Sequence, residues 1–132
     1  MAPRFLLDTQ IVLRWFFDVR RLSKPQARTL DRVLERHEPV ALSAISLLEI
    51  AILSNEGKLP SGSLQKVFSA LQGDPVFRIV PLSYEVAAEA GALMGLRDPS
   101  DRVIVATARL HRLQLLTSDQ RIIDSNLVPV ID

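Results

Sequence analysis

Short, almost wholly apolar runs recur along this chain, and each of the first four is followed by a segment with helical or turn character. The runs lie at 4–7, 40–43, 77–80, 115–117 and 128–131. Strands that are apolar on both faces are typical of parallel sheets covered by helices on each side. The sequence therefore predicts an α/β protein, with a central parallel sheet of four to five short strands and helices on both faces.

The segments between these runs have the spacing and the end signals of helices. Pro25 is tolerated in a first helical turn, and Gly57 and Gly73 are typical of positions where a helix ends. Helices are predicted over 10–17, 24–37, 46–56, 63–71, 84–96, 99–112 and 120–124.

The composition limits the size and the class of the protein. A chain of 132 residues with 48% hydrophobic content can form one core but not two, so a single domain over 1–132 is expected. The net charge of +1 predicts no strongly basic surface overall, although charges can segregate between faces. The absence of cysteine excludes disulfides, thiolate metal ligands and a thiol nucleophile.

The N-terminal region does not have the pattern of a signal peptide or of a membrane span. Arg4, Asp8 and Arg14 interrupt its apolar residues before a run of sufficient length can form. Together with the lack of cysteine, this pattern predicts a soluble, cytoplasmic protein that does not associate with membranes.

Four acidic residues lie beside strongly apolar stretches, where an unpaired carboxylate is costly. Asp8 and Asp119 follow two of the predicted strands, and Glu49 and Asp101 fall in the first turns of predicted helices. Ligands of open α/β sheets bind at the carboxyl ends of the strands, so these acids are expected to converge there. Two ionised carboxylates about 4 Å apart repel by roughly 4 kcal/mol, which a divalent cation would relieve. Oxygen ligands alone favour Mg²⁺ or Mn²⁺ over Zn²⁺.

Most of these acids also have an ordinary structural interpretation. Ser46 and Glu49 match a capping box, in which each side chain bonds to the other's backbone amide. Asp98 precedes a proline and matches a helix N-cap, with Asp101 as its reciprocal partner. Asp119 can cap the short helix that follows it. Only the acid after the first strand lacks an evident structural role.

Taken together, the motifs that contain these acids resemble the PIN-domain ribonucleases, and more narrowly the VapC-type toxins of toxin–antitoxin pairs. The resemblance covers FLLDT at 5–9, LSAISLLEIA at 42–51, GKL at 57–59, RDPSDR at 97–102 and LTSD at 116–119. It implies a three-layer α/β/α PIN-like fold and a Mg²⁺-dependent ribonuclease, Mn²⁺ being a possible substitute, that cleaves RNA by metal-activated water. It also implies a homodimer and a cognate VapB-type antitoxin as the partner.

The resemblance assigns roles to particular residues of this chain. Catalytic and metal-binding roles fall on Asp8, Glu49, Asp101 and Asp119. Asp98 is an additional acid, and Thr9, Thr117 and Ser118 are supporting side chains near the metal-bound water.

Three positions depart from the pattern of this subgroup. Its members often have His before the Arg-Asp-Pro motif and a bulky aromatic after it, where this chain has Leu96 and Ser100. They also often have Trp before the glutamate, where this chain has Leu48. No carboxylate is lost, so the departures concern the choice of substrate and partner more than the reaction.

Other residues have both a functional and a structural interpretation. Trp15, Phe16 and Phe17 could stack on RNA bases, but packing against the sheet or a partner is the favoured interpretation. His37 and His111 are expected to interact with helix dipoles rather than to act in catalysis. The candidate contacts to the RNA backbone, whose alternative is an ordinary solvated helix face, are Arg14, Arg97, Arg102 and Arg112.

Two other classes of function compete with the ribonuclease. A catalytically silent PIN-like module would keep the acids and only bind a partner. A phosphotransfer or receiver-type domain would also place Asp at the end of the first strand. The phosphotransfer motif needs a second acid where this chain has Gln10, and a receiver needs its acceptor near the end of the third strand, where Pro81 lies.

Overall fold

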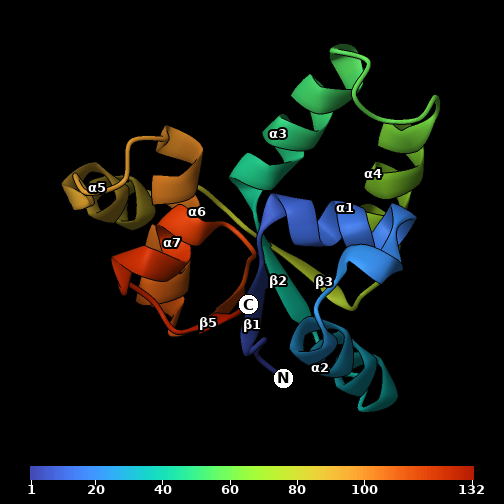
Figure 1. Cartoon of the computed structure of the whole chain (residues 1–132), viewed down its shortest axis with the longest axis horizontal. Helices are drawn as coiled ribbons and strands as arrows, with labels where there is room; N and C mark the ends of the chain where they lie inside the picture. Colours follow the sequence, from blue (N-terminus) through green and yellow to red (C-terminus); the bar gives the residue numbers. More distant parts are fainter.

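The sheet of this protein contains five strands that all run parallel. The computed structural model describes the whole chain, residues 1–132 (Figure 1). The strand order is β3-β2-β1-β4-β5. The strands are β1 (Phe5–Leu7), β2 (Val40–Ser43), β3 (Phe77–Val80), β4 (Gln114–Leu116) and β5 (Val130–Ile131). The predicted α/β class, with a central parallel sheet of four to five short strands, is confirmed.

Seven α-helices and one 3-10 helix connect the strands and cover the sheet. Figure 1 shows α1, α2 and α4 on one side of the strands and α5, α6 and α7 on the other. The helices are α1 (Thr9–Phe17), η1 (Val19–Arg21), α2 (Lys24–Glu35), α3 (Ala44–Asn55), α4 (Ser63–Gly73), α5 (Tyr84–Ala92), α6 (Pro99–His111) and α7 (Gln120–Ser125).

Alternation along the central strands divides the core into two layers. In β1, Phe5 and Leu7 face the cluster that α1, α2 and α4 complete, whereas Leu6 faces the cluster that α5, α6 and α7 complete. Successive side chains of a strand point to opposite faces, so a strand with helices on both sides must be apolar throughout. The two clusters together give the three-layer α/β/α arrangement.

The direction in which successive strands are added to the sheet changes at the boundary between β1 and β4. From β1 it moves outward to β2 and β3, and it then returns to place β4 on the other side of β1. Leu7 pairs with Leu116, so both strands end at the same level. In open α/β sheets this switch point leaves a crevice at the carboxyl ends of the strands, and Asp8 and Thr117 come directly after them.

Several predicted helix boundaries were wrong by a few residues. Helix α3 begins at Ala44 rather than at 46, because the Ser43 side chain accepts a hydrogen bond from the Ile45 amide and caps the helix. Helix α2 ends at Glu35 rather than at 37, and His37 adopts a left-handed conformation with φ of 53°. Helix α5 ends at Ala92 rather than at 96, since the chain turns there to bury Leu93 and Leu96 in the core.

The aromatic residues at the end of α1 pack against the edge of the sheet. The ring of Trp15 meets the ring of Phe77 edge-on, with centroids 5.9 Å apart, and Phe16 stacks on Phe77 at 6.0 Å. The packing interpretation of the Trp15–Phe17 segment is therefore the correct one. No helix of the chain has the length and the apolar character needed to cross a membrane.

Candidate active site

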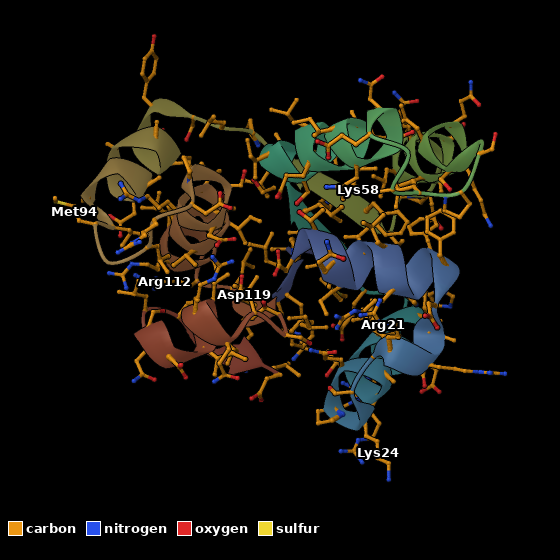
Figure 2. All side chains as sticks on the ribbon, turned by 45° about the horizontal axis from the view of Figure 1, so that its top comes forward. Arg21, Lys24, Lys58, Met94, Arg112 and Asp119 are labelled. Atoms are coloured by element: carbon orange, nitrogen blue, oxygen red, sulfur yellow. The ribbon has the colours of Figure 1, made fainter.

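A wholly polar cavity lies at the carboxyl ends of β1 and β4, where the chain reverses across the sheet. Its volume is about 340 Å³, and no hydrophobic residue lines it. Figure 2 shows Asp119 near the middle of the molecule, between the ribbons of α1 and α7. The lining residues are Asp8, Thr9, Gln10, Arg14, Glu49, Asp98, Asp101, Ser118, Asp119 and Arg121. The structure thus brings all five acids of the sequence analysis to one cavity.

Asp8 is held in place by two hydrogen bonds, which makes it both a helix cap and a cavity residue. Its Oδ1 accepts from the Thr9 amide at 2.8 Å, at the start of α1. Its Oδ2 accepts from the Thr117 hydroxyl at 2.7 Å, and that hydroxyl accepts in turn from the Asp119 amide at 3.1 Å. The sequence analysis found no structural role for Asp8, and the N-cap is that role. Thr117 does not line the cavity and acts through Asp8.

Glu49 is positioned by a neighbour from another helix rather than by a capping box. The Thr9 hydroxyl donates to Glu49 Oε1 at 2.6 Å and is hydrogen-bonded to the Ser46 hydroxyl at 2.8 Å. Because α3 begins at Ala44, Ser46 lies inside the helix, and the capping-box interpretation was wrong. Thr9 therefore joins the first turn of α1 to α3 and points the Glu49 carboxylate into the cavity.

Replacing Thr9 with valine should test this connection. Valine keeps the shape but removes the hydroxyl, which leaves a buried Ser46 hydroxyl without its partner and frees the Glu49 carboxylate. We expect a loss of about 1–3 kcal/mol in the free energy of unfolding. Losing a residue that orients a ligand typically lowers metal affinity or activity by about 10–100-fold. Urea unfolding and calorimetric titration with Mg²⁺ measure the two effects, and Ser46→Ala, which keeps the Thr9–Glu49 bond, is the matched control.

The acids of α6 and α7 share one arginine. Arg121 Nη2 lies 3.1 Å from Asp119 Oδ2 and 3.7 Å from Asp101 Oδ2. Asp119 also caps α7 by accepting from the Arg121 amide, and Asp98 caps α6 by accepting from the Ser100 amide. Both N-cap interpretations are confirmed, but Asp101 makes no reciprocal bond to Asp98 and faces the cavity instead.

Burial and mutual repulsion make three of these carboxyls hard to ionise. Burial raises the pKa of Asp101 to about 7, and repulsion from Asp119, Asp98 and Asp8 adds to the shift. Burial also raises the pKa of Asp8 and of Glu49, although the hydrogen bonds from Thr117 and Thr9 oppose this. For Asp119 burial acts in the same direction, but hydrogen bonds from Arg121 outweigh it and the pKa is lowered. The cavity therefore favours a cationic ligand that removes the repulsion.

The donor chemistry of the cavity suits a hard divalent cation. It offers carboxylate oxygens with neither imidazole nor thiol groups, which is the ligand set of Mg²⁺ or Mn²⁺. As the side chains lie here, no three of the acids are close enough to hold one ion together. Binding an ion would thus require some of these carboxylates to move inward and Arg121 to release Asp101.

Of the arginines singled out in the sequence, one lies at the cavity. Arg14 lines it, and its buried Nε has no hydrogen-bond partner. Arg97, Arg102 and Arg112 do not line it: the Arg102 Nε donates to the Leu96 carbonyl, and Arg112 lines a separate cavity with Leu113 and Pro129.

Sequence reasoning missed two residues of the cavity, Gln10 and Arg121. Each follows a predicted site acid by two residues, at the start of a helix. Their position in the sequence could have indicated this, because the first turn of a helix that follows a strand stays close to the end of that strand.

A doubly covered parallel sheet with clustered acids at its switch point defines an α/β protein with a candidate metal centre. The family model of the PIN domain matches residues 5–125, and the chain belongs to this family. It is 34% identical over 121 residues to Ribonuclease VapC22 of Mycobacterium tuberculosis (strain ATCC 25618 / H37Rv), covering 89% of this chain and 88% of that protein.

Solved structures with the same fold include toxin–antitoxin assemblies. The crystal structure of FitAcB from Neisseria gonorrhoeae superposes with a TM-score of 0.70 at 26% identity, over 97% of this chain and 96% of that one. A toxin–antitoxin complex from Klebsiella pneumoniae gives a TM-score of 0.65 at 25% identity, over 96% and 95% of the two chains. The PIN-like fold expected from the sequence is confirmed.

Proposed function

We propose that this protein is a Mg²⁺-dependent ribonuclease and the toxin of a type II toxin–antitoxin pair. The observation that carries the proposal is the wholly polar cavity at the switch point, where burial and repulsion raise the pKa of Asp8, Glu49 and Asp101. Membership of the PIN family and the 34% identity to a VapC ribonuclease support the same reaction.

The proposed ligands are Asp8, Glu49, Asp101 and Asp119. A divalent cation held there supplies Lewis acidity, which lowers the pKa of water and offsets negative charge on the phosphate. Thr117 and Thr9 fix the orientation of Asp8 and Glu49 through bonds of 2.7 and 2.6 Å. Such bonds hold carboxylates ready for a ligand, so less rearrangement is needed when the site fills.

Two arginines flank the acids and are suited to hold a phosphate of the substrate. Arg14 lines this cavity, and its guanidinium can donate to phosphate oxygens. Arg121 now neutralises Asp119 and Asp101. Its side chain is largely exposed at the same cavity, so its guanidinium is also placed to contact a phosphate of the RNA.

We also propose an antitoxin partner of the VapB type and a second copy of this chain as partners. The FitAcB and Klebsiella pneumoniae structures support an antitoxin. Helix α3 presents apolar side chains on two faces: Ile50 is buried in the core, whereas Leu48 and Ile52 are exposed on the outside. An outer apolar face of this kind suits a protein interface, and the oligomeric state follows from light scattering.

The competing functions make different predictions. In a receiver-type sheet the third strand is central, whereas β3 here is an edge strand, which disfavours that alternative. A silent binding module would not cleave RNA under any condition.

The deciding experiment is cleavage of total RNA by the purified protein with Mg²⁺ and with EDTA. We expect discrete fragments with Mg²⁺ and none with EDTA. Equal cleavage in both, or cleavage in neither across a panel of cellular RNAs, would contradict the proposal.

A further inference from the structure

A second polar cavity lies on the α2 side of the sheet, beside the amino ends of β1 and β4. It encloses about 210 Å³ between α2 and the strands. Its charged residues are three arginines, Arg4, Arg32 and Arg36, and the Gln114 amide adds a polar group. No carboxylate lines it. Three arginines in one pocket favour an anion, and planar guanidinium groups are well suited to phosphate oxygens.

Glu38 contacts two of these arginines, but its single negative charge does not balance the positive charges of all three. It accepts from Arg4 Nη2 at 2.8 Å and from Arg4 Nε at 3.2 Å, and it lies 4.0 Å from Arg36 Nη1. Arg32 takes part in none of the ion pairs of the chain. Glu38 therefore pairs with Arg4 and lies near Arg36, whereas Arg32 has no carboxylate within 4.0 Å, so the pocket keeps N–H donors free for an anion.

Helix α2 connects this pocket to the acidic cavity. Near its start, Gln26 Nε2 donates to the Ser118 hydroxyl at 3.1 Å, and Ser118 lines the acidic cavity. Arg28, Arg32 and the C-cap Arg36 lie at every fourth position and form an exposed stripe on a side of the helix away from the buried Gln26. From Gln26 to Arg36 the helix rises about 15 Å, which is the length of about four stacked nucleotides.

We propose that this arginine stripe and its pocket bind backbone phosphates of the RNA strand that extends from the acidic cavity. The site supplies affinity for longer substrates and takes no part in bond cleavage. This inference rests on the proposed ribonuclease function for the identity of the ligand. Phosphate contacts of this type carry no sequence information, so the site is expected to hold and orient RNA rather than to select it.

The test measures RNA binding to an Asp8→Asn background, which keeps the RNA uncut. Labelled single-stranded RNAs of about twelve nucleotides and of three nucleotides are compared by fluorescence anisotropy at several salt concentrations. Arg32→Glu should weaken binding of the longer RNA about tenfold and reduce the slope of log K against log salt by at least about 0.7. The trinucleotide, which fills only the acidic cavity, should bind as before.

Lys66→Glu is the matched control, because it makes the same change of charge on an exposed helical side chain of α4 that takes part in no ion pair. Lys66→Glu should leave both affinities unchanged. Because Arg32 is exposed and unpaired by any carboxylate, its replacement should also leave the melting temperature unchanged.

Three results would overturn the inference. One is equal weakening by Lys66→Glu, and another is equal weakening for the trinucleotide, since either would indicate only a general charge effect. The third combines two observations. Inorganic phosphate raises the melting temperature of the wild type but not of Arg32→Glu, and Arg32→Glu binds the longer RNA as tightly as the wild type. That result would indicate a site for a free anion. Weakening confined to the longer RNA supports the inference even if the wild type cleaves no RNA, and failed cleavage then counts against the proposed function alone.

Discussion

Replacing Asp8 with asparagine is expected to reduce Mg²⁺-dependent RNA cleavage by about a thousandfold or more. That loss corresponds to about 4 kcal/mol of transition-state stabilisation, the order of magnitude that a metal ion supplies in phosphoryl chemistry. Asparagine keeps one carbonyl oxygen but removes the negative charge that attracts a divalent cation. Asp8 is the most buried of the acids in the cavity, at 8% exposure, so neighbouring water cannot replace it as a ligand.

The fold of the Asp8→Asn protein should be intact, because asparagine is as good an N-cap as aspartate. The side-chain oxygen of asparagine can still accept from the Thr9 amide, which now binds Asp8 Oδ1. Asp8→Ala is the informative comparison, since it removes the cap as well as the charge and should lose about 1 kcal/mol of stability.

Single-turnover cleavage and thermal unfolding separate the two effects. A variant Asp8→Asn that cleaves RNA at the wild-type rate would show that the cavity does not hold the catalytic ion. A variant that is inactive because it is unfolded would be recognised by its circular dichroism.

The sequence was sufficient to predict the sheet and the position of the acids. Residues 5–7 and 40–42 are apolar at every position, as expected for strands that lie between two helical layers. Asp8 and Asp119 then fall just beyond strand ends, and parallel strands that pair in register end at one edge. The acids therefore converge because the parallel strands end at one edge of the sheet, and the sequence pattern indicates where these strands end.

The contacts that orient the acids could not be predicted in the same way. The bond from Thr9 to Glu49 depends on where α3 begins, and a start at Ala44 instead of 46 rotates Ser46 from a cap position to the helix interior. Ser43 and Ser46 are both suitable N-cap residues, so the sequence alone does not decide which of them begins the helix. Tertiary packing decides between them. Arg121 was missed for a related reason, because its guanidinium reaches Asp101 from another helix.

Asp101 is expected to destabilise the metal-free protein at neutral and alkaline pH, so Asp101→Asn should be more stable than the wild type there. The cause is burial, with repulsion from Asp119, Asp98 and Asp8 added, which raises the pKa of Asp101 from 3.8 to about 7. A shift of that size would be worth roughly 4 kcal/mol for a fully buried group. Solvent screening of this partly exposed carboxyl reduces the expected gain to about 1–2 kcal/mol.

The dependence on pH follows from the sign of the shift. A carboxyl whose pKa is higher in the folded state than in the unfolded state favours folding while it is protonated. That contribution is complete below about pH 4 and is lost as the pH rises through about 7. Asparagine does not ionise, so the advantage of Asp101→Asn should be small at pH 5 and should increase up to pH 8.

With Mg²⁺ the wild type should become more stable than Asp101→Asn. This reversal would show that Asp101 binds the ion and is not only repelled by the neighbouring acids. An ion that binds only the folded state stabilises it in proportion to the logarithm of its concentration over its dissociation constant. Wild type should therefore gain stability with Mg²⁺ at pH 8, and Asp101→Asn should gain much less because it lacks one ligand charge. Urea unfolding at pH 5 and pH 8, with EDTA and with Mg²⁺, measures all four conditions. If Asp101→Asn is stabilised equally at both pH values, the ionisation of Asp101 does not determine the stability of this site.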